Sequence, residues 1–257
     1  MPFAAQLAVT AAVVLAVLLA AFVVGVRTGR HRGVDVAWGL AFAAVGLTGC
    51  GLTGGRGLLA TVLVTVWGVR LAAHLWWRAR GAGEDPRYAA MLSRAPGSRS
   101  YALRKVYLLQ ALIVWFVSLP VQAATRLPSP TPALAAAGTA LWAVGLAFEA
   151  VADAQLARFQ ADPAHHGQLL TTGLRSWTRH PNYFGDACVW WGLTLPVLGT
   201  PAGWALLPCP LLMTWLLAFG SGKPMLERRL GATRPGWAEY AARTSPFLPL
   251  PPRGPRK

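Results

Sequence analysis

Seven long apolar stretches, separated by short polar segments, run through nearly the whole of this 257-residue chain. A helix needs about 20 consecutive apolar residues to cross the hydrocarbon core of a bilayer. Apolar residues make up 54% of the chain and charged residues only 13%, whereas a soluble domain carries roughly 25% charged residues. The sequence therefore predicts an all-α membrane protein with seven transmembrane helices. The predicted spans are Phe3–Val26, Val34–Thr53, Gly57–Trp77, Val106–Thr125, Pro132–Ala152, Phe184–Gly199 and Ala202–Gly220.

The basic residues are divided unequally between the two sides that these spans define. All but three of the 24 Lys and Arg residues follow the first, third, fifth or seventh span; the exceptions are Arg56 and Arg126 on the other side and Arg70 within a span. Loops rich in Lys and Arg stay in the cytoplasm. We therefore expect the N-terminus outside and the C-terminus in the cytoplasm. Topology then explains the net charge of +15, and nucleic acid is not expected as a partner.

The predicted loops differ in length as well as in charge. The outer connections are short, whereas the inner segments 78–105, 153–183 and 221–257 are long. Long loops on one face of a scaffold usually carry the function of a protein. We expect a single integral-membrane domain over residues 1–257, with its candidate site on the inner face.

The segment Arg179–Gly192 places polar residues directly before an aromatic, apolar stretch. Pro181 ends any helix that arrives from the N-terminal side and suits the first turn of the helix that follows. Polar groups kept at a membrane boundary usually serve a ligand or a catalytic step. The side chains suited to hold phosphates, an amide or a flat ring are Arg175, Arg179, His180, Asn182 and Tyr183.

Several familiar sites are absent from the sequence. It has no phosphate-binding Gly-rich loop, no dinucleotide fingerprint and no Gly-x-Ser-x-Gly elbow. Cys50, Cys188 and Cys209 lie in apolar segments without metal-ligand spacing, and the adjacent His165 and His166 cannot chelate well from one backbone. No metal is therefore expected, and a large anionic cofactor has to be held outside a Rossmann fold.

The run Ser176–Asp186, followed by Trp190-Trp191-Gly192, resembles the C-terminal domain of the steroid 5-alpha-reductase family, particularly its bacterial branch. The resemblance covers roughly residues 30 to 250 in order. Its Arg-His-Pro-x-Tyr part is also similar, more distantly, to isoprenylcysteine carboxyl methyltransferases. The other matching pieces are Asp35–Gly39, Gly83–Tyr88, Phe148–Leu156 with Phe159, Ser221-Gly222 with Glu227, and Tyr240 with Thr244–Pro249.

The resemblance implies a seven-helix membrane oxidoreductase, in a bacterial inner membrane, that uses NADPH entering from the cytoplasm. It would reduce a C=C bond conjugated to a ketone in a lipophilic substrate, steroid-like or another lipid, as a 3-oxo-5-alpha-steroid 4-dehydrogenase does. By motif, Asn182 and Asp186 match residues that bind the nicotinamide portion, and Asp153 matches an aspartate that holds the cofactor. Tyr240 and Arg243 match a tail Tyr and Arg near the phosphates.

The tail, residues 221–257, is expected to pack on the cofactor side, where Glu227 joins the same face. Lipophilic substrate and membrane lipid are the expected partners. The resemblance departs from the family at one point, because the early helices lack the Gln-Glu pair that polarises the substrate carbonyl in steroid-reducing members. Tyr88 and the nearby Glu84 are the catalytic candidates, since a phenol can donate to a developing enolate. The alternative hypothesis is a membrane methyltransferase that uses S-adenosylmethionine.

Overall fold

The computed structural model describes residues 1–128, 130–220 and 222–252. The predictions that concern Ser221 and the basic residues at 253, 256 and 257 lie outside this part of the chain. Within it, the regular elements are helices, and there is one isolated β-bridge, between Thr178 and Ser245. The helices are α1 (Phe3–Thr28), α2 (Gly33–Leu52), α3 (Leu58–Ala79), α4 (Pro86–Leu92), α5 (Arg99–Ala102), the π-helix η1 (Leu103–Leu108), α6 (Leu109–Val117), α7 (Leu119–Ala123), α8 (Pro132–Ala161), the 3₁₀ turns η2 (Pro163–His165) and η3 (Gly173–Ser176), α9 (Pro181–Thr194), the 3₁₀ turn η4 (Leu195–Gly199), α10 (Pro201–Trp204), α11 (Pro208–Ala218), α12 (Lys223–Thr233) and α13 (Trp237–Arg243).

Six helical stretches in the described residues are long and apolar enough to cross a membrane. They confirm the prediction of an all-helical, multi-pass membrane protein. The sixth predicted span corresponds to α9, which at 14 residues is shorter than a span on its own, so the count of seven and the orientation stay predictions. The six stretches are Phe3–Thr28, Gly33–Leu52, Leu58–Ala79, Arg99–Val117, Pro132–Ala161 and Pro201–Thr233.

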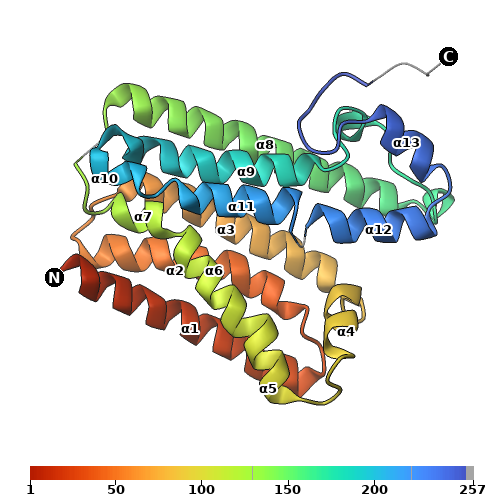
Figure 1. The fold of residues 1–257 in the computed structure, drawn as a ribbon, viewed down its shortest axis with the longest axis horizontal. Coiled ribbons are helices and arrows are strands. Elements are labelled where there is room, and N and C mark those ends of the chain that lie inside the picture. The colour runs from red at the N-terminus through yellow and green to blue at the C-terminus, as the bar shows by residue number, and fades with distance from the viewer. Residues whose placement is uncertain (129, 221, 253–257) are drawn as a thin grey trace. The chain divides into compact units, whose positions relative to one another are not determined.

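The chain divides into two compact units, which are described separately below. Unit 1 holds residues 1–131 and 197–209, and unit 2 holds residues 132–196 and the chain from Pro210 onward. In unit 1, α2 packs between α1 and α3 (Figure 1). The backbones of α2 and α3 meet at Gly39 and Gly68, where a Cβ atom on Gly39 would lie 2.4 Å from the carbonyl oxygen of Gly68. Any side chain at this crossing would force the two helices apart.

The core of unit 2 is the helix pair α8 and α9, which lie side by side in Figure 1. Two glycines on each helix face the partner helix: Gly138 and Gly145 on α8, Gly185 and Gly192 on α9. A Cβ atom on Gly145 would lie 2.5 Å from the carbonyl oxygen of Gly185. Small residues that let backbones approach are typical of helix contacts in membranes. This contact fixes the start of α9, and with it the Arg179–Gly192 segment, against α8.

Three of the predicted spans differ from the helices. The seventh, Ala202–Gly220, is divided into α10 and α11 by a turn at residues 205–207. The apolar run that begins at Pro132 ends at Ala152, but α8 continues to Ala161, because Gln155, Leu156 and Arg158 favour helix. The fourth predicted span, Val106–Thr125, is instead a helix that starts at Arg99, passes through the π-helix η1 and ends at Val117. The shift adds polar residues at the C-terminal end of α8 and at the N-terminal end of the fourth helical stretch.

Candidate functional site

The loop before α9 is positioned by the C-terminal part of α8. Oε1 of Gln155 accepts a hydrogen bond from the backbone N–H of Leu174 at 3.0 Å. Gly173 makes this approach possible, since a Cβ atom there would lie 2.5 Å from the same oxygen. Pro181 is the first residue of α9, as predicted, and the loop therefore delivers Arg175, Arg179 and His180 to the start of that helix.

The C-terminal tail lies along the same loop. The backbone N–H of Arg179 donates to the carbonyl oxygen of Ser245 at 2.9 Å, and the N–H of Leu250 donates to that of Trp177 at 3.1 Å. The buried hydroxyl of Thr178 donates to the carbonyl oxygen of Phe247 at 2.9 Å. These bonds hold the tail on the loop, and the sequence contained no pattern that predicted this pairing.

Arg179 joins the loop to both C-terminal helices. Its Nε donates to Oε1 of Glu227 on α12 at 2.8 Å. Its Nη1 donates to the carbonyl oxygens of Ala241 at 2.6 Å and Thr244 at 3.1 Å, at the C-terminal end of α13. A cation suits that end, because it carries unpaired carbonyl groups and the negative pole of the helix dipole. The Arg179 side chain is only 11% exposed, so these contacts are well shielded from water.

His180 is completely buried and bonds to the same carboxylate. Its Nε2 lies 3.0 Å from Oε1 of Glu227, and an ionised carboxylate can only accept, so Nε2 carries the hydrogen. Burial lowers the pKa of His180; the hydrogen bond to Glu227 opposes this, and Arg175 and Arg179 reinforce it. His180 is therefore neutral, and its Nδ1 is a hydrogen-bond acceptor. Within the described residues this buried Nδ1 has no partner.

Arg175 has a second buried nitrogen atom without a hydrogen-bond partner among the described residues. Its Nη1 donates to the carbonyl oxygen of Arg179 at 2.9 Å, but its Nε has no partner among the described residues. Burial lowers the pKa of Arg175, and Tyr240 and Tyr183 oppose this. The Tyr240 hydroxyl donates to the carbonyl oxygen of Arg175 at 2.7 Å, and burial raises its pKa to about 12. Arg175 thus keeps its charge, beside a tyrosine that stays protonated.

The remaining predicted cofactor residues fall into two groups. Asn182, Tyr183 and Asp186 lie on the first turns of α9, where the Tyr183 ring stacks on His180 with a centroid separation of 5.3 Å and an interplanar angle of 6°. Asp153 is buried on α8. Arg243, in contrast, forms an exposed ion pair with Glu239 at 3.1 Å on the surface of α13. The structure thus brings most of the predicted residues to one end of the α8–α9 pair, but places Arg243 on an exposed helix face.

Tyr88, the predicted proton donor, lies in unit 1 and is buried. Its hydroxyl donates to Oδ1 of Asp35 and accepts from Nε2 of Gln110 at 3.4 Å. Burial and the Asp35 charge raise the pKa of Tyr88 well above 10. The phenol is therefore protonated at any physiological pH, and Asp35 fixes its orientation.

Arg87 completes this cluster by bridging two carboxylates. Its Nη2 lies 2.6 Å from Oδ2 of Asp35, and its Nε lies 3.0 Å from Oδ1 of Asp85. Burial alone would lower the pKa of Arg87, but the two carboxylates outweigh it and raise that pKa. Asp35 and Arg87 belong to two separate motifs of the sequence, and their ion pair was not predicted, since 52 residues separate them along the chain.

Glu84 has a different environment from Tyr88. Its carboxylate accepts hydrogen bonds from the backbone N–H groups of His31, of Arg32 at 2.9 Å and of Asp85 at 2.8 Å. His31 and Arg32 directly precede α2, so a carboxylate here also interacts favourably with the positive end of that helix. Through these hydrogen bonds Glu84 connects the α1–α2 loop to the segment before α4. A catalytic role for Glu84 stays a prediction.

The fold and the grouped polar residues define an integral, multi-pass helical membrane protein with a buried polar site at the start of α9. A family model described as a protein of unknown function (DUF1295) matches residues 21–244, and the chain therefore belongs to this family. The family is associated with steroid 5-alpha-reductase-like proteins. The comparisons with curated proteins and with solved structures gave no match.

Proposed function

We propose that the protein is an NADPH-dependent membrane reductase that acts on a C=C bond conjugated to a ketone in a lipophilic substrate. The observation that carries the proposal is the pair of buried nitrogen atoms without partners, Nε of Arg175 and Nδ1 of His180. Each buried polar atom without a hydrogen bond lowers the stability of the folded protein by about 1–3 kcal/mol. Such atoms are expected where a ligand completes the hydrogen bonds.

The residues of this site fit a nicotinamide dinucleotide. Arg175 is a cation suited to a phosphate oxygen, and the neutral Nδ1 of His180 is an acceptor suited to an amide N–H. Tyr183 offers an aromatic face, and Asn182 and Asp186 lie four residues apart on one face of α9. When bound, NADPH would supply the hydride, and its two electrons would reduce the β-carbon of the enone. Glu227 and Arg179 would act indirectly, by keeping His180 in the tautomer that leaves Nδ1 open.

The reduction also consumes one proton at the carbonyl side of the substrate. A protonated phenol suits this role, because it can donate as negative charge develops on the oxygen. We assign the donor as Tyr88, which Asp35 and Gln110 orient. Asp35 has a side chain that is 24% exposed, so it connects the phenol with water for reprotonation.

One observation favours the second candidate, a methyltransferase that uses S-adenosylmethionine. The Arg179–His180–Glu227 network is built on the Arg-His-Pro run, which resembles methyltransferases as well as reductases. The run from Asn182 to Asp186 resembles reductases and therefore favours the reductase proposal.

Cofactor identity separates the two candidates. The full-length protein in detergent would be heated with NADPH, with NADP⁺ or with S-adenosylmethionine, since a ligand that binds the folded state raises the melting temperature. We expect stabilisation by the two nucleotides. Stabilisation by S-adenosylmethionine alone would falsify the reductase proposal.

The site itself is tested with Asn182→Ala and Asp186→Ala. Both variants are expected to lose the stabilisation by nucleotide while retaining the melting temperature of the free protein. The matched control is Asp162→Ala, which removes an exposed carboxylate of unit 2. Unchanged nucleotide affinity in both site variants would show that the cofactor site lies elsewhere.

We propose further that α9 and η4 together form a seventh span, with the C-terminus in the cytoplasm of a bacterial cell. The support is the concentration of basic residues on one side. Single cysteines at Arg56 and Arg94, both exposed, would be labelled with an impermeant maleimide on intact cells. Labelling of Arg56→Cys but not of Arg94→Cys is expected, and the reverse result contradicts the orientation.

A further inference from the structure

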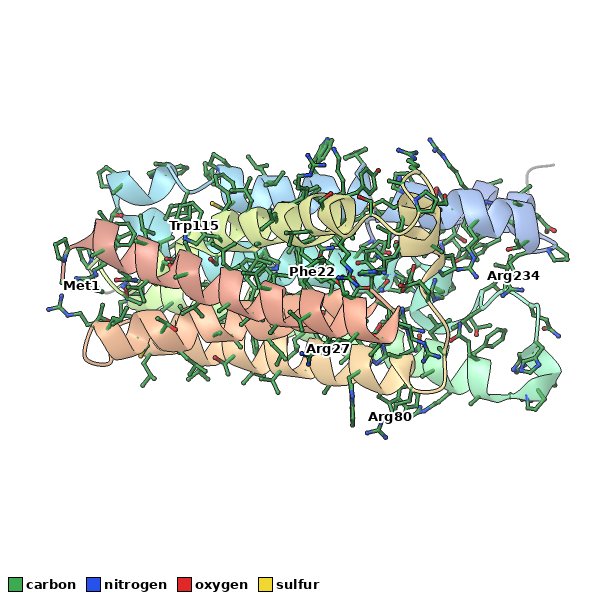
Figure 2. All side chains as sticks on the ribbon, turned by 90° about the horizontal axis from the view of Figure 1, so that it is seen from below. Met1, Phe22, Arg27, Arg80, Trp115 and Arg234 are labelled. Carbon is green, nitrogen blue, oxygen red and sulfur yellow. The ribbon has the colours of Figure 1, made fainter. Side chains whose placement is uncertain are left out.

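One end of unit 1 carries exposed arginines at and just beyond the C-terminal ends of α1 and α3. Helices α1 and α3 run in the same direction because α2 returns between them, so their C-terminal ends lie together. Figure 2 shows Arg27 and Arg80 toward the end of this unit that is far from Met1. We call Arg27, Arg30, Arg78 and Arg80 the basic rim; all four side chains are exposed.

The acidic residues of unit 1 do not neutralise the basic rim. This unit has three, and each is engaged elsewhere: Asp35 by Arg87 and Tyr88, Asp85 by Arg87, and Glu84 by backbone N–H groups. Among the described residues of the unit, no carboxylate pairs with a rim arginine. The rim is therefore a surface of one sign, which attracts anions.

Two tryptophans place this charge beside the bilayer. Trp76 and Trp77 end the apolar helix α3 and are 55% and 53% exposed. Tryptophan is enriched where a span meets the lipid headgroups. The guanidinium carbon of Arg80 lies 3.6 Å from the centroid of the Trp76 ring, a cation–π contact that holds the planar group in one orientation. An arginine ordered in this way is prepared for a phosphate ligand.

Ordinary helix-end effects account for only part of the rim. Arg27 and Arg78 lie in the last turns of α1 and α3, where a cation stabilises the helix dipole. Arg80 follows the end of α3 in an extended conformation and stacks on Trp76. The helix dipole also favours a cation at this C-cap position, but it does not explain the stacking of Arg80 on Trp76.

We propose that the basic rim, with Trp76 and Trp77, binds the phosphate of an anionic phospholipid headgroup in the leaflet around this end of unit 1. Guanidinium groups recognise phosphate through paired N–H donors. A membrane lipid is the source that fits, because the phosphate would lie at headgroup level while the two indole rings contact the acyl boundary. The inference is independent of the proposed enzymatic activity.

The test measures lipid retention by native mass spectrometry. The full-length protein would be released from micelles that contain equal amounts of phosphatidylglycerol and phosphatidylcholine. We expect wild type to retain phosphatidylglycerol preferentially. Arg78→Ala and Arg80→Ala each remove one positive charge. Each substitution should weaken the retention of phosphatidylglycerol by about fivefold, and the two should add in the double variant. Arg80→Lys keeps the charge but loses the planar stack, so it should fall between wild type and Arg80→Ala.

Arg56→Ala is the matched control, because Arg56 is an exposed arginine at the opposite end of the same unit; it should retain lipid as wild type does. The proposal is overturned if wild type retains both lipids equally, or if Arg78→Ala/Arg80→Ala retains phosphatidylglycerol as wild type does. Competition by millimolar inorganic phosphate would also overturn it, by showing that a soluble anion is the ligand. Retention of phosphatidylcholine by every variant checks that each is folded.

Discussion

Each unit of the molecule groups arginine and carboxylate side chains around a buried tyrosine, but the two units complete the hydrogen bonds of these groups differently. In unit 1, Arg87, Asp35 and Tyr88 bond to one another and to Asp85 and Gln110. None of these side chains has a buried polar atom without a partner. This cluster is complete with the residues that the chain itself supplies.

The cluster of unit 2 is incomplete by the same measure. Glu227 satisfies Arg179 and one nitrogen of His180, yet Nδ1 of His180 and Nε of Arg175 have no partner in the described residues. A closed network serves orientation and stability, whereas an open one is prepared for a ligand. If the proposed reductase function is correct, nucleotide binds to the open cluster of unit 2.

The largest effect is expected for Arg179→Ala. The change removes the bonds to Glu227 and to the end of α13, and it leaves the carboxylate with His180 as its remaining partner. Breaking a buried ion pair on one side lowers stability by about 3–5 kcal/mol. Melting followed by tryptophan fluorescence would measure it, with the exposed Arg228→Ala as control. Equal melting temperatures for the two variants would show that Arg179 does not hold the C-terminal helices.

A smaller loss is expected for Asp35→Asn in unit 1. The amide oxygen can still accept from Tyr88, but the ion pair with Arg87 is lost, and Arg87 keeps Asp85 as its partner. We expect a decrease in stability of about 1–3 kcal/mol and an unchanged stabilisation by nucleotide. A loss of nucleotide binding would contradict the assignment of ligand binding to unit 2.

His180 in unit 2 should make the stability of the protein depend on pH. Burial lowers its pKa in the folded protein below the ordinary histidine value of about 6.5, so the unfolded chain binds the proton more readily. The stability that this adds is present above pH 6.5 and decreases as the pH falls below it. Melting temperatures between pH 7.5 and 5 would show this decrease in wild type, and a shallower one in His180→Gln. Parallel profiles would mean that His180 titrates alike in both states.

Tyr88→Phe is expected to change stability by only about 1 kcal/mol. It removes the hydroxyl that donates to Asp35 without opening a cavity. If Tyr88 donates the proton, kcat with an enone substrate falls while the affinity for NADPH stays the same. Equal kcat in Tyr88→Phe and wild type would remove Tyr88 from the mechanism.

The smallest effect is expected for Arg243→Ala. Its ion pair with Glu239 is exposed, with side-chain exposures of 46% and 73%, and such pairs contribute about 0–1 kcal/mol. Nucleotide affinity should not change, although the sequence motif placed Arg243 near the phosphates. A tenfold weaker affinity would return Arg243 to the site and enlarge the open cluster of unit 2.

Much of the architecture could be predicted from local features of the sequence. Apolar stretches of about 20 residues predicted the helices, since each span must satisfy its backbone hydrogen bonds within itself. Pro181 predicted the start of α9 correctly for the same local reason. The candidate residues of unit 2 could be selected from the sequence because they are polar side chains at the end of an apolar run, and their role as a cofactor site stays a prediction.

What the sequence determined by itself is the class of the protein: helices, their approximate bounds, and which polar residues have to be accommodated beside the membrane. Only the tertiary structure decided how those residues are paired. Arg179 meets Glu227, 48 residues away, and Tyr88 meets Asp35, 53 residues away. The physical reason is that helix formation depends on neighbours in the chain, whereas the completion of a buried hydrogen bond depends on which helices pack together. That packing distinguishes a closed cluster in unit 1 from an open one in unit 2.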